Sequence, residues 1–589
     1  MGRFKSGIMF RQARTKVIDG ALGTFSGGKK EIVSLETIEL TGEDDTQNSN
    51  GAPVEKENPL GYNLDYFTAF YIIIQGVIGT GIFATPASVL SSIGSIGASY
   101  VLWVSGFIIA LFEISVYIEF VTYFQRRSGG DVAYLEQSYP RPAFLVPTTY
   151  AAVSVLLSYM TSSAVAFGQY ILSAADVEIT TWRQRGIGVG VLTFVALAAG
   201  ANTRISMKIS SILGFMKMVF LLFIIITGFV VMGRGTSVTD SLANFKNAWE
   251  GTTRDGNAIS NAILKVSFSY SGTQYLFCVV GESDPKKTKN MFRYFVPAVV
   301  FAILVIYLLV ISSYYAGCGT VEEIKNSGTL IASLFFENVF GSKSAQKALS
   351  SLVAISALGH LFAAFVGHSR ALRECGRQGV LPFSRHWTST KPFGTPLLAI
   401  FATWIVNVIV LVAPPAGDAY NFIIDLSSYA NYIFKLLLVV GLVLVRRERK
   451  AKGLGSAGWK VPLPILIITI FYEVFVIAMA WVPPADGTLK GSDVSFFYCT
   501  YAIVCIGILG LCVLYYFLWA KVFPRVWNYE HRVLYYELEN GEKGHTVIKV
   551  DKSEVEDWDH EHDNDGKHIR DTELVLNEVE LIETNKEKG

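Results

Sequence analysis

The sequence predicts an all-helical polytopic membrane protein with twelve transmembrane helices, of which the first and the sixth are broken. Hydrophobic residues make up 51% of the 589 residues and charged residues only 17%, whereas soluble domains average about 25% charged residues. Twelve apolar segments are each near the ~20 residues that cross a bilayer as a helix. Gly, Ser and Thr interrupt two of these segments at matching positions, which favours two inverted repeats of five helices.

The charged residues are concentrated in the two tails, 1–62 and 521–589. Together the tails hold 18 of the 50 Lys and Arg residues and 27 of the 49 Asp and Glu residues. This distribution excludes a soluble enzyme, a disulfide-rich secreted module and a disordered regulator. We expect 1–62 to be disordered. We expect the acidic tail 521–589 to be mostly unfolded, apart from a short amphipathic turn near 522–536.

The apolar segments must be helical in lipid, because only a helix satisfies every backbone polar group locally. We expect spans at 65–90, 99–124, 143–175, 186–201, 209–232, 258–282, 294–318, 348–369, 395–411, 419–445, 462–482 and 493–520. The first repeat then occupies 63–256, the second occupies 257–445, and 446–520 holds the last two spans.

Basic residues set the expected orientation. If the N-terminus is cytosolic, the inner loops carry 20 Lys and Arg residues and the outer loops carry 9. Positive residues stay on the cytosolic side, so we expect both termini in the cytosol. The six Cys residues lie in or beside apolar runs without CxxC spacing, and we interpret them as small buried hydrophobic residues. We expect neither a metal nor a cofactor.

The first helix break lies in the run IGTGIF at 78–83, and the second lies in FSYSGT at 268–273. Non-helical backbone in mid-membrane survives only where it lines a cavity. The freed N–H groups of the first break would bind a carboxylate, and the freed carbonyls of the second would accept from an ammonium group. An α-amino acid carries both groups. The candidate binding residues are Gly79, Thr80, Gly81, Phe268, Ser269, Tyr270 and Ser271.

Ionisable residues inside the spans are functional candidates, because their insertion is costly. Glu119 lies near a helix end, where a structural role is expected, whereas Glu113 can face the interior of the bundle. Lys265 and Lys435 are expected to extend toward the membrane surface. A GxGxxG match at 453–458 follows a basic loop rather than a strand, so we reject it as a nucleotide site.

Further sequence runs extend over most of 63–520. They include YIEF at 117–120, WRQRGIGV at 182–189, NFKNAWEG at 244–251, GVLPFS at 379–384 and APPAGDAY at 413–420. With the first break, these runs resemble the amino acid–polyamine–organocation (APC) superfamily in its L-type (LAT-like) branch, and within it the fungal high-affinity methionine permeases. The resemblance implies a LeuT-like fold in which the two breaks hold the substrate. Thr273 departs from the family, which commonly has a gating Trp there.

The resemblance also implies candidates for ion coupling. Sodium-coupled relatives of this fold hold a cation between spans one, five and eight, and sodium-independent relatives are similar to this chain in placing a basic side chain there. Lys217 in span five and His360 in span eight are therefore the coupling candidates. A Lys paired with a backbone carbonyl and a His that is merely packed are the structural alternatives.

Taken together, the residues and the resemblance predict a secondary active transporter, not an enzyme, that imports amino acids across the plasma membrane. Methionine is the expected substrate and protons the expected coupling ion. A broad neutral amino-acid exchanger and a non-transporting nutrient receptor stay open as alternatives. The expected partners are the amino-acid substrate, membrane lipid and, by resemblance, ubiquitin-ligase machinery acting on tail residues such as Lys29 and Lys30. No nucleic-acid partner is expected.

Overall fold

The computed structural model describes most of the chain between Ala52 and Ile569. The described ranges are 52–53, 62, 64–157, 160–234, 241–413, 419–454, 458–484, 489–490, 496–538, 543–563 and 566–569. Most of the tail predicted to be disordered, including Lys29 and Lys30, lies outside these residues.

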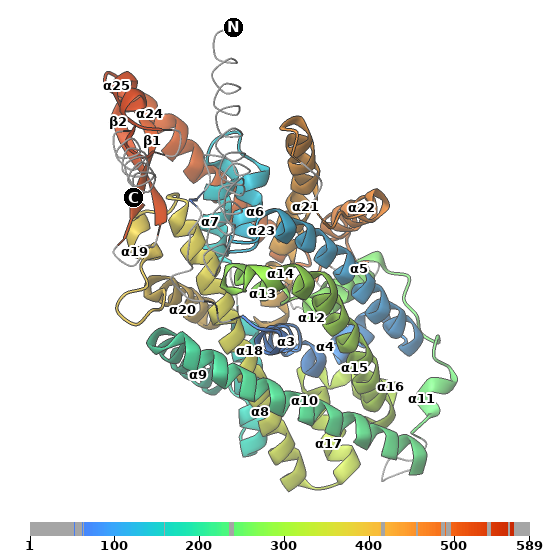
Figure 1. The fold of residues 1–589 in the computed structure, drawn as a ribbon. Helices are drawn as coiled ribbons and strands as arrows, with labels where there is room; N and C mark the ends of the chain where they lie inside the picture. Colours follow the sequence, from blue (N-terminus) through green and yellow to red (C-terminus); the bar gives the residue numbers. More distant parts are fainter. Residues whose placement is uncertain are drawn as a thin grey trace, which may run out of the picture. The chain divides into compact units, whose positions relative to one another are not determined.

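The described chain is mostly helical (Figure 1). The helices before the second break are α3 (Tyr66–Val77), α4 (Gly81–Ile93), α5 (Ile96–Tyr123), α6 (Asp131–Ser138), α7 (Leu145–Leu156), α8 (Thr161–Ala175), α9 (Thr181–Ala201), α10 (Thr203–Arg234), α11 (Ala243–Lys246) and α12 (Gly256–Tyr270). Those after it are α13 (Gln274–Cys278), η1 (Val280–Glu282), α14 (Pro285–Asn290), η2 (Met291–Phe295), α15 (Val296–Gly317), α16 (Val321–Asn326), η3 (Gly328–Leu330), α17 (Ile331–Phe340), α18 (Lys343–Arg377), α19 (Ser384–Thr388), α20 (Leu397–Val412), α21 (Ala419–Ala451), α22 (Leu463–Met479), α23 (Thr500–Phe517), η4 (Leu518–Val522) and α24 (Phe523–Val526).

Nine helical segments of the described chain are long and apolar enough to cross a membrane, judged by length and composition. Three more apolar helical segments are shorter, at Gly328–Phe340, Leu397–Val412 and Leu463–Met479. The predicted sixth span falls on α12 and α13, which the second break separates. The chain is therefore a multi-pass helical membrane protein, and the count of twelve spans stays a prediction.

Local sequence fixes the ends of several helices. Asp65 begins α3 by accepting the Thr68 N–H at 2.7 Å, which satisfies one of the amides that a helix start leaves without an acceptor. Thr320 and Glu323 form a reciprocal capping box at the start of α16. Gly94 ends α4 with a φ of +87°, a left-handed conformation that favours glycine.

The long helix α10 has one face buried in the bundle and another face exposed. Its inward face buries Phe220, Leu221 and Ile224. Its other face exposes large apolar side chains, namely Ile205, Ile212, Phe215, Met216, Val219, Leu222, Phe223, Ile226, Phe229 and Val230. An apolar surface of this length would be unfavourable in water, and it fits contact with lipid.

The C-terminal tail contains regular structure, so the prediction that it is mostly unfolded is wrong for much of its length. Strand β1 (Tyr529–Glu537) pairs antiparallel with β2 (Lys543–Asp551), and α25 (Val555–Glu561) follows (Figure 1). Strand β1 contains three Tyr and one Val, and β2 contains two Val, one Ile and one Thr, all of which favour strands. The acidic composition of the whole tail concealed this local pattern.

Candidate functional site

The first break separates α3 from α4. Helix α3 ends at Val77, Ile78 leaves helical geometry with a ψ of 71°, and α4 begins at Gly81. The first N–H groups of a helix lack acceptors within that helix, and they form its positive end. The start of α4 is therefore suited to a carboxylate.

The second break separates α12 from α13. Gly272 has a φ of +115°, and a Cβ there would lie 2.2 Å from the Gly76 carbonyl oxygen. Only glycine therefore allows the backbones of the two breaks to approach this closely. The Phe268 carbonyl accepts from the Ser271 N–H at 3.1 Å and from the Ser271 Oγ–H at 2.6 Å. In this conformation that predicted ammonium acceptor is already occupied.

Tyr307 of α15 joins the two breaks, and no motif in the sequence pointed to it. Its buried hydroxyl lies 3.0 Å from the Val77 carbonyl oxygen and 2.8 Å from the Ser269 carbonyl oxygen. The breaks are linked a second time where the hydroxyls of Thr85 and Ser269 lie 2.9 Å apart. The unwound segments thus have a fixed relative position.

A cavity of about 160 Å³, here called the central cavity, lies against both breaks. Six of the predicted residues line it, namely Gly79, Thr80, Gly81, Phe268, Ser271 and His360. Ser269 is buried behind the wall, with its hydroxyl on the Lys265 carbonyl at 3.0 Å. Tyr270 is also buried, and its ring lies 5.2 Å from that of Tyr307.

The rest of the cavity wall comes partly from the broken helices and partly from helices in which the sequence showed no interruption. Polar lining residues that sequence reasoning missed include Ser162, Gln274, Ser427, Asn431 and Lys435. They lie in otherwise apolar helical segments, and only the packing of those segments reveals which side chains reach the cavity.

Lys217 lies directly on the first break. Its side chain comes from α10, is 2% exposed, and donates from Nζ to the carbonyl of Ile78. It does not line the cavity. His360 does, and its Nδ1 lies 2.9 Å from the Gln75 carbonyl oxygen. The two basic side chains are close enough to interact electrostatically.

Glu113 and Glu119, the two carboxylates of α5, both form ion pairs. Glu119 is bound by Arg446 through contacts of 2.7 and 2.5 Å, as expected for a structural carboxylate. Lys435 Nζ lies 2.6 Å from Glu113 Oε2, so the expectation that it extends toward the membrane surface is wrong. The same expectation is wrong for Lys265, which is buried. Within the described ranges, no group of three His, Cys, Asp or Glu side chains is placed to hold a metal ion.

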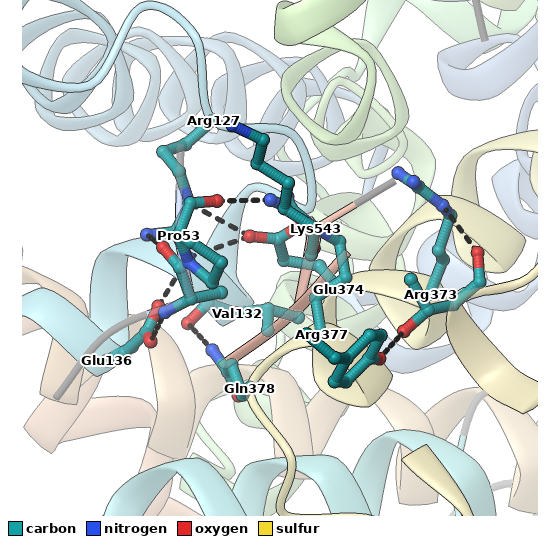
Figure 2. Close-up of polar contacts among 12 residues, drawn as sticks. Pro53, Arg127, Val132, Glu136, Arg373, Glu374, Arg377, Gln378 and Lys543 are labelled. Atoms are coloured by element: carbon teal, nitrogen blue, oxygen red, sulfur yellow. Dashed lines mark hydrogen bonds and ion pairs between the residues drawn. The ribbon is translucent and has the colours of Figure 1, made fainter. Parts of the chain in front are cut away.

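A second polar group, here called the Arg–Glu cluster, joins the end of α18 to the loop before α6 (Figure 2). Arg127 Nη2 lies 2.5 Å from Glu136 Oε2 and 2.7 Å from Glu374 Oε1. Arg377 contacts the second oxygen of Glu374 at 2.7 Å. Burial raises the pKa of the Glu136 carboxyl, and the Arg127 guanidinium opposes that rise.

Two residues of the N-terminal tail bind this cluster. Ala52 is 1% exposed, donates its N–H to Glu136 at 2.5 Å and accepts from Arg127 at 2.9 Å. The Pro53 carbonyl accepts from Arg377 (Figure 2). The prediction of disorder up to residue 62 is therefore wrong here. These contacts join the backbone of the tail to side chains that the fold brings together from distant segments, and amino-acid composition does not reveal them.

The C-terminal hairpin reaches the same region. Arg377 Nε donates to the carbonyl of Lys543 at 2.8 Å, and the hydroxyls of Tyr536 and Thr388 lie 2.7 Å apart. Both tails thus contact the end of α18.

Comparison with known proteins shows which family the chain belongs to. The family model described as amino acid permease matches residues 64–510. The high-affinity methionine permease of Saccharomyces cerevisiae is 33% identical over 487 residues, which cover 82% of this chain and 82% of that protein. The low-affinity methionine permease of the same yeast is 27% identical, covering 67% of this chain and 72% of that protein.

Mammalian transporters also match. The mouse b(0,+)-type amino acid transporter 1 is 25% identical, over 75% of this chain and 87% of that protein. The human cystine/glutamate transporter is 28% identical, over 69% and 78% of the respective chains. The chain therefore belongs to the amino acid permease family and is a membrane transporter rather than an enzyme.

Proposed function

We propose that this chain imports methionine across the plasma membrane by proton-coupled secondary active transport. In this proposal both termini are cytosolic, and twelve spans form two inverted repeats of five helices followed by two further spans. One observation carries the proposal: both helix breaks lie on the same cavity, where Gly79, Thr80 and Gly81 face Phe268 and Ser271. Broken helices that meet at one site are typical of transporters with inverted repeats.

The two ends of an amino acid fit the two breaks. The carboxylate binds the amide N–H groups at the start of α4, where the helix dipole is positive. The ammonium binds the carbonyl of Phe268, which now accepts two hydrogen bonds from Ser271. The Ser271 hydroxyl must therefore turn away when substrate binds, and this side chain competes with the substrate for one acceptor.

The choice of methionine rests on the wall of the cavity and on the two yeast relatives. Leu157, Met160, Phe268 and Tyr275 all line the central cavity. An unbranched thioether fits irregular apolar space and makes favourable contacts with aromatic rings. The yeast relatives are named as methionine permeases.

Proton coupling rests on Lys217. Its ammonium binds the Ile78 carbonyl that the first break exposes, so a change in its charge acts directly on the unwound backbone. Sodium requires oxygen ligands, as hard cations do, and an ammonium on this carbonyl excludes it. Loss of the proton would weaken this contact, because a neutral amine is a weaker donor than an ammonium, and proton binding would restore its strength.

The test is uptake of labelled methionine into vesicles that contain only the purified protein. Uptake is expected to increase as the outside pH falls and to be independent of sodium. Most of the other nineteen amino acids are expected to compete poorly with methionine. Competition by all neutral amino acids would favour the broad exchanger. Binding without flux would favour the receptor.

Variants of α10 test the coupling residue. Lys217→Ala is expected to abolish accumulation against a gradient, and Lys217→Arg to fix the charge, because guanidinium does not deprotonate in proteins. Lys208→Ala on the exposed side of the same helix is the matched control and is expected to transport normally. Normal, pH-dependent accumulation by Lys217→Ala would contradict this role.

A further inference from the structure

Three ionisable side chains from three different helices come together within the bundle. Glu113 lies on α5, Lys435 on α21 and Glu473 on α22. Lys435 Nζ lies 2.6 Å from Glu113 Oε2, and Glu473 interacts electrostatically with both. We call these three residues the acidic triad.

The triad has one carboxylate more than it has cations. Lys435 is engaged by Glu113, whereas Glu473 is 0% exposed. Among the residues that the structure describes, no group donates a hydrogen bond to either carboxylate oxygen of Glu473. A buried carboxylate that is ionised and lacks donors is strongly unfavourable, above all within a membrane span. A proton on Glu473 removes this penalty.

Among the described residues that interact electrostatically with Glu473, Lys435 is the one cation. Tyr432 and Tyr472 interact with it electrostatically, and their hydroxyls lie 3.4 Å apart. Ser267 of α12 lies 2.9 Å from the Tyr472 hydroxyl. Each of these three side chains ends in an uncharged hydroxyl group. Glu113 lies within hydrogen-bonding reach of Glu473, and a protonated Glu473 can donate to it. Two carboxyl groups form such a bond only when they share a proton.

The triad adjoins the substrate site. Lys435, Tyr432 and Ser267 all line the central cavity, so one side of the triad faces the space proposed for the amino acid. A proton that enters or leaves the triad therefore has a path through the cavity.

We propose that Glu113, Glu473 and Lys435 form a proton-binding site in the wall of the central cavity, distinct from Lys217. The Glu473 carboxyl holds the proton and donates it to Glu113. On release, the O–H bond breaks, its electron pair stays on the carboxylate, and the proton passes to water in the cavity. A role of this proton in coupling rests on the proposed function, whereas its presence on the triad does not.

The test uses infrared spectroscopy of the purified full-length protein in liposomes, where a protonated carboxyl gives a C=O band that a carboxylate lacks. The wild type at neutral pH is expected to show this band, and Glu473→Gln to lose it. Glu119→Gln is the matched control. Glu119 is equally buried on α5, but it accepts from Arg446 and from the Val461 N–H, so it is ionised and its replacement is expected to leave the band.

A second variant protects the test if Glu473→Gln does not fold. Glu113→Gln frees Lys435 to pair with Glu473, which then ionises, so the band is expected to disappear although Glu473 is intact. Persistence of the wild-type band in either variant would overturn the proposal, as would its loss in Glu119→Gln.

The same preparation separates this proposal from the proposed function. A protein with the Glu473-dependent band but without methionine flux would refute the transport proposal and leave the proton site standing. Proton-driven methionine flux without such a band would refute the proton site alone.

Discussion

Tyr307→Phe removes one hydroxyl and changes almost nothing else. That hydroxyl contacts the carbonyls of Val77 and Ser269 at 3.0 and 2.8 Å, and these carbonyls belong to the last turns of the two helices before the breaks. The phenyl ring still fills the same buried space. The variant therefore isolates the polar link between the broken helices.

The magnitude follows from the buried carbonyls. A typical hydrogen bond contributes about 0.5–1.5 kcal/mol net, and a buried partner left without a donor costs about 1–3 kcal/mol. We expect the arrangement of the breaks to lose about 1–3 kcal/mol. Since 1.4 kcal/mol corresponds to a factor of ten, the affinity for substrate should fall roughly 5- to 140-fold.

The assay compares binding and thermal unfolding of purified Tyr307→Phe with those of Tyr100→Phe. Tyr100 is the matched control because its hydroxyl also contacts α15, 2.6 Å from the Ser312 hydroxyl, but this contact joins α5 to α15 and involves neither of the carbonyls that Tyr307 binds at the breaks. Both variants should lower the unfolding temperature. Only Tyr307→Phe should weaken methionine binding.

Unchanged methionine affinity in Tyr307→Phe would refute the claim that the relative position of the breaks builds the site. An equal loss of affinity in Tyr100→Phe would also refute it, because general destabilisation would then explain the result.

The remaining predictions concern the cavity and the two tails. Gly79→Val should abolish uptake while surface expression persists, because even a Cβ at this position would lie 2.9 Å from Nδ1 of His360. A normal KM in this variant would contradict the assignment of the substrate site. Ser271→Ala should lower KM because it removes the hydroxyl that occupies the Phe268 carbonyl. The expected decrease is about 2- to 10-fold, the equivalent of one hydrogen bond. An increase in KM would show that the hydroxyl binds substrate instead. Ala52→Asp places a carboxylate beside Glu136 and should release the N-terminal tail, seen as faster proteolysis before α3; unchanged cleavage would show that the contact is unimportant. Burial lowers the pKa of His531 below its ordinary 6.5, so the hairpin should be most stable above that pH and its amide hydrogens should lose protection, relative to the intrinsic exchange rate at each pH, as the pH falls below it; protection factors independent of pH would contradict this.

The position of the helix breaks could be predicted from sequence, because Gly79, Gly81 and Gly272 occur together with Ser and Thr at matching positions of two apolar spans. Glycine frees the backbone locally, so the signal lies in consecutive residues. The family resemblance rests on equally local runs, and the family match at 64–510 agrees with it.

Contacts between distant segments could not be predicted in this way. Tyr307 is one of many tyrosines in apolar helices, and the pairing of Lys435 with Glu113 joins residues 322 positions apart. Snorkelling was the reasonable expectation for a lone lysine, and it failed because its carboxylate partner comes from another helix. The same holds for Ala52, whose backbone groups bind a cluster that only the fold assembles.

The most direct test of the central claim is the internal pH of vesicles that contain the purified protein, recorded when methionine is added outside in sodium-free buffer. The proposed mechanism predicts that methionine entry acidifies the interior, and that Lys217→Ala abolishes this acidification while Lys208→Ala does not. Methionine entry without a change in internal pH, or entry that requires sodium, would contradict it.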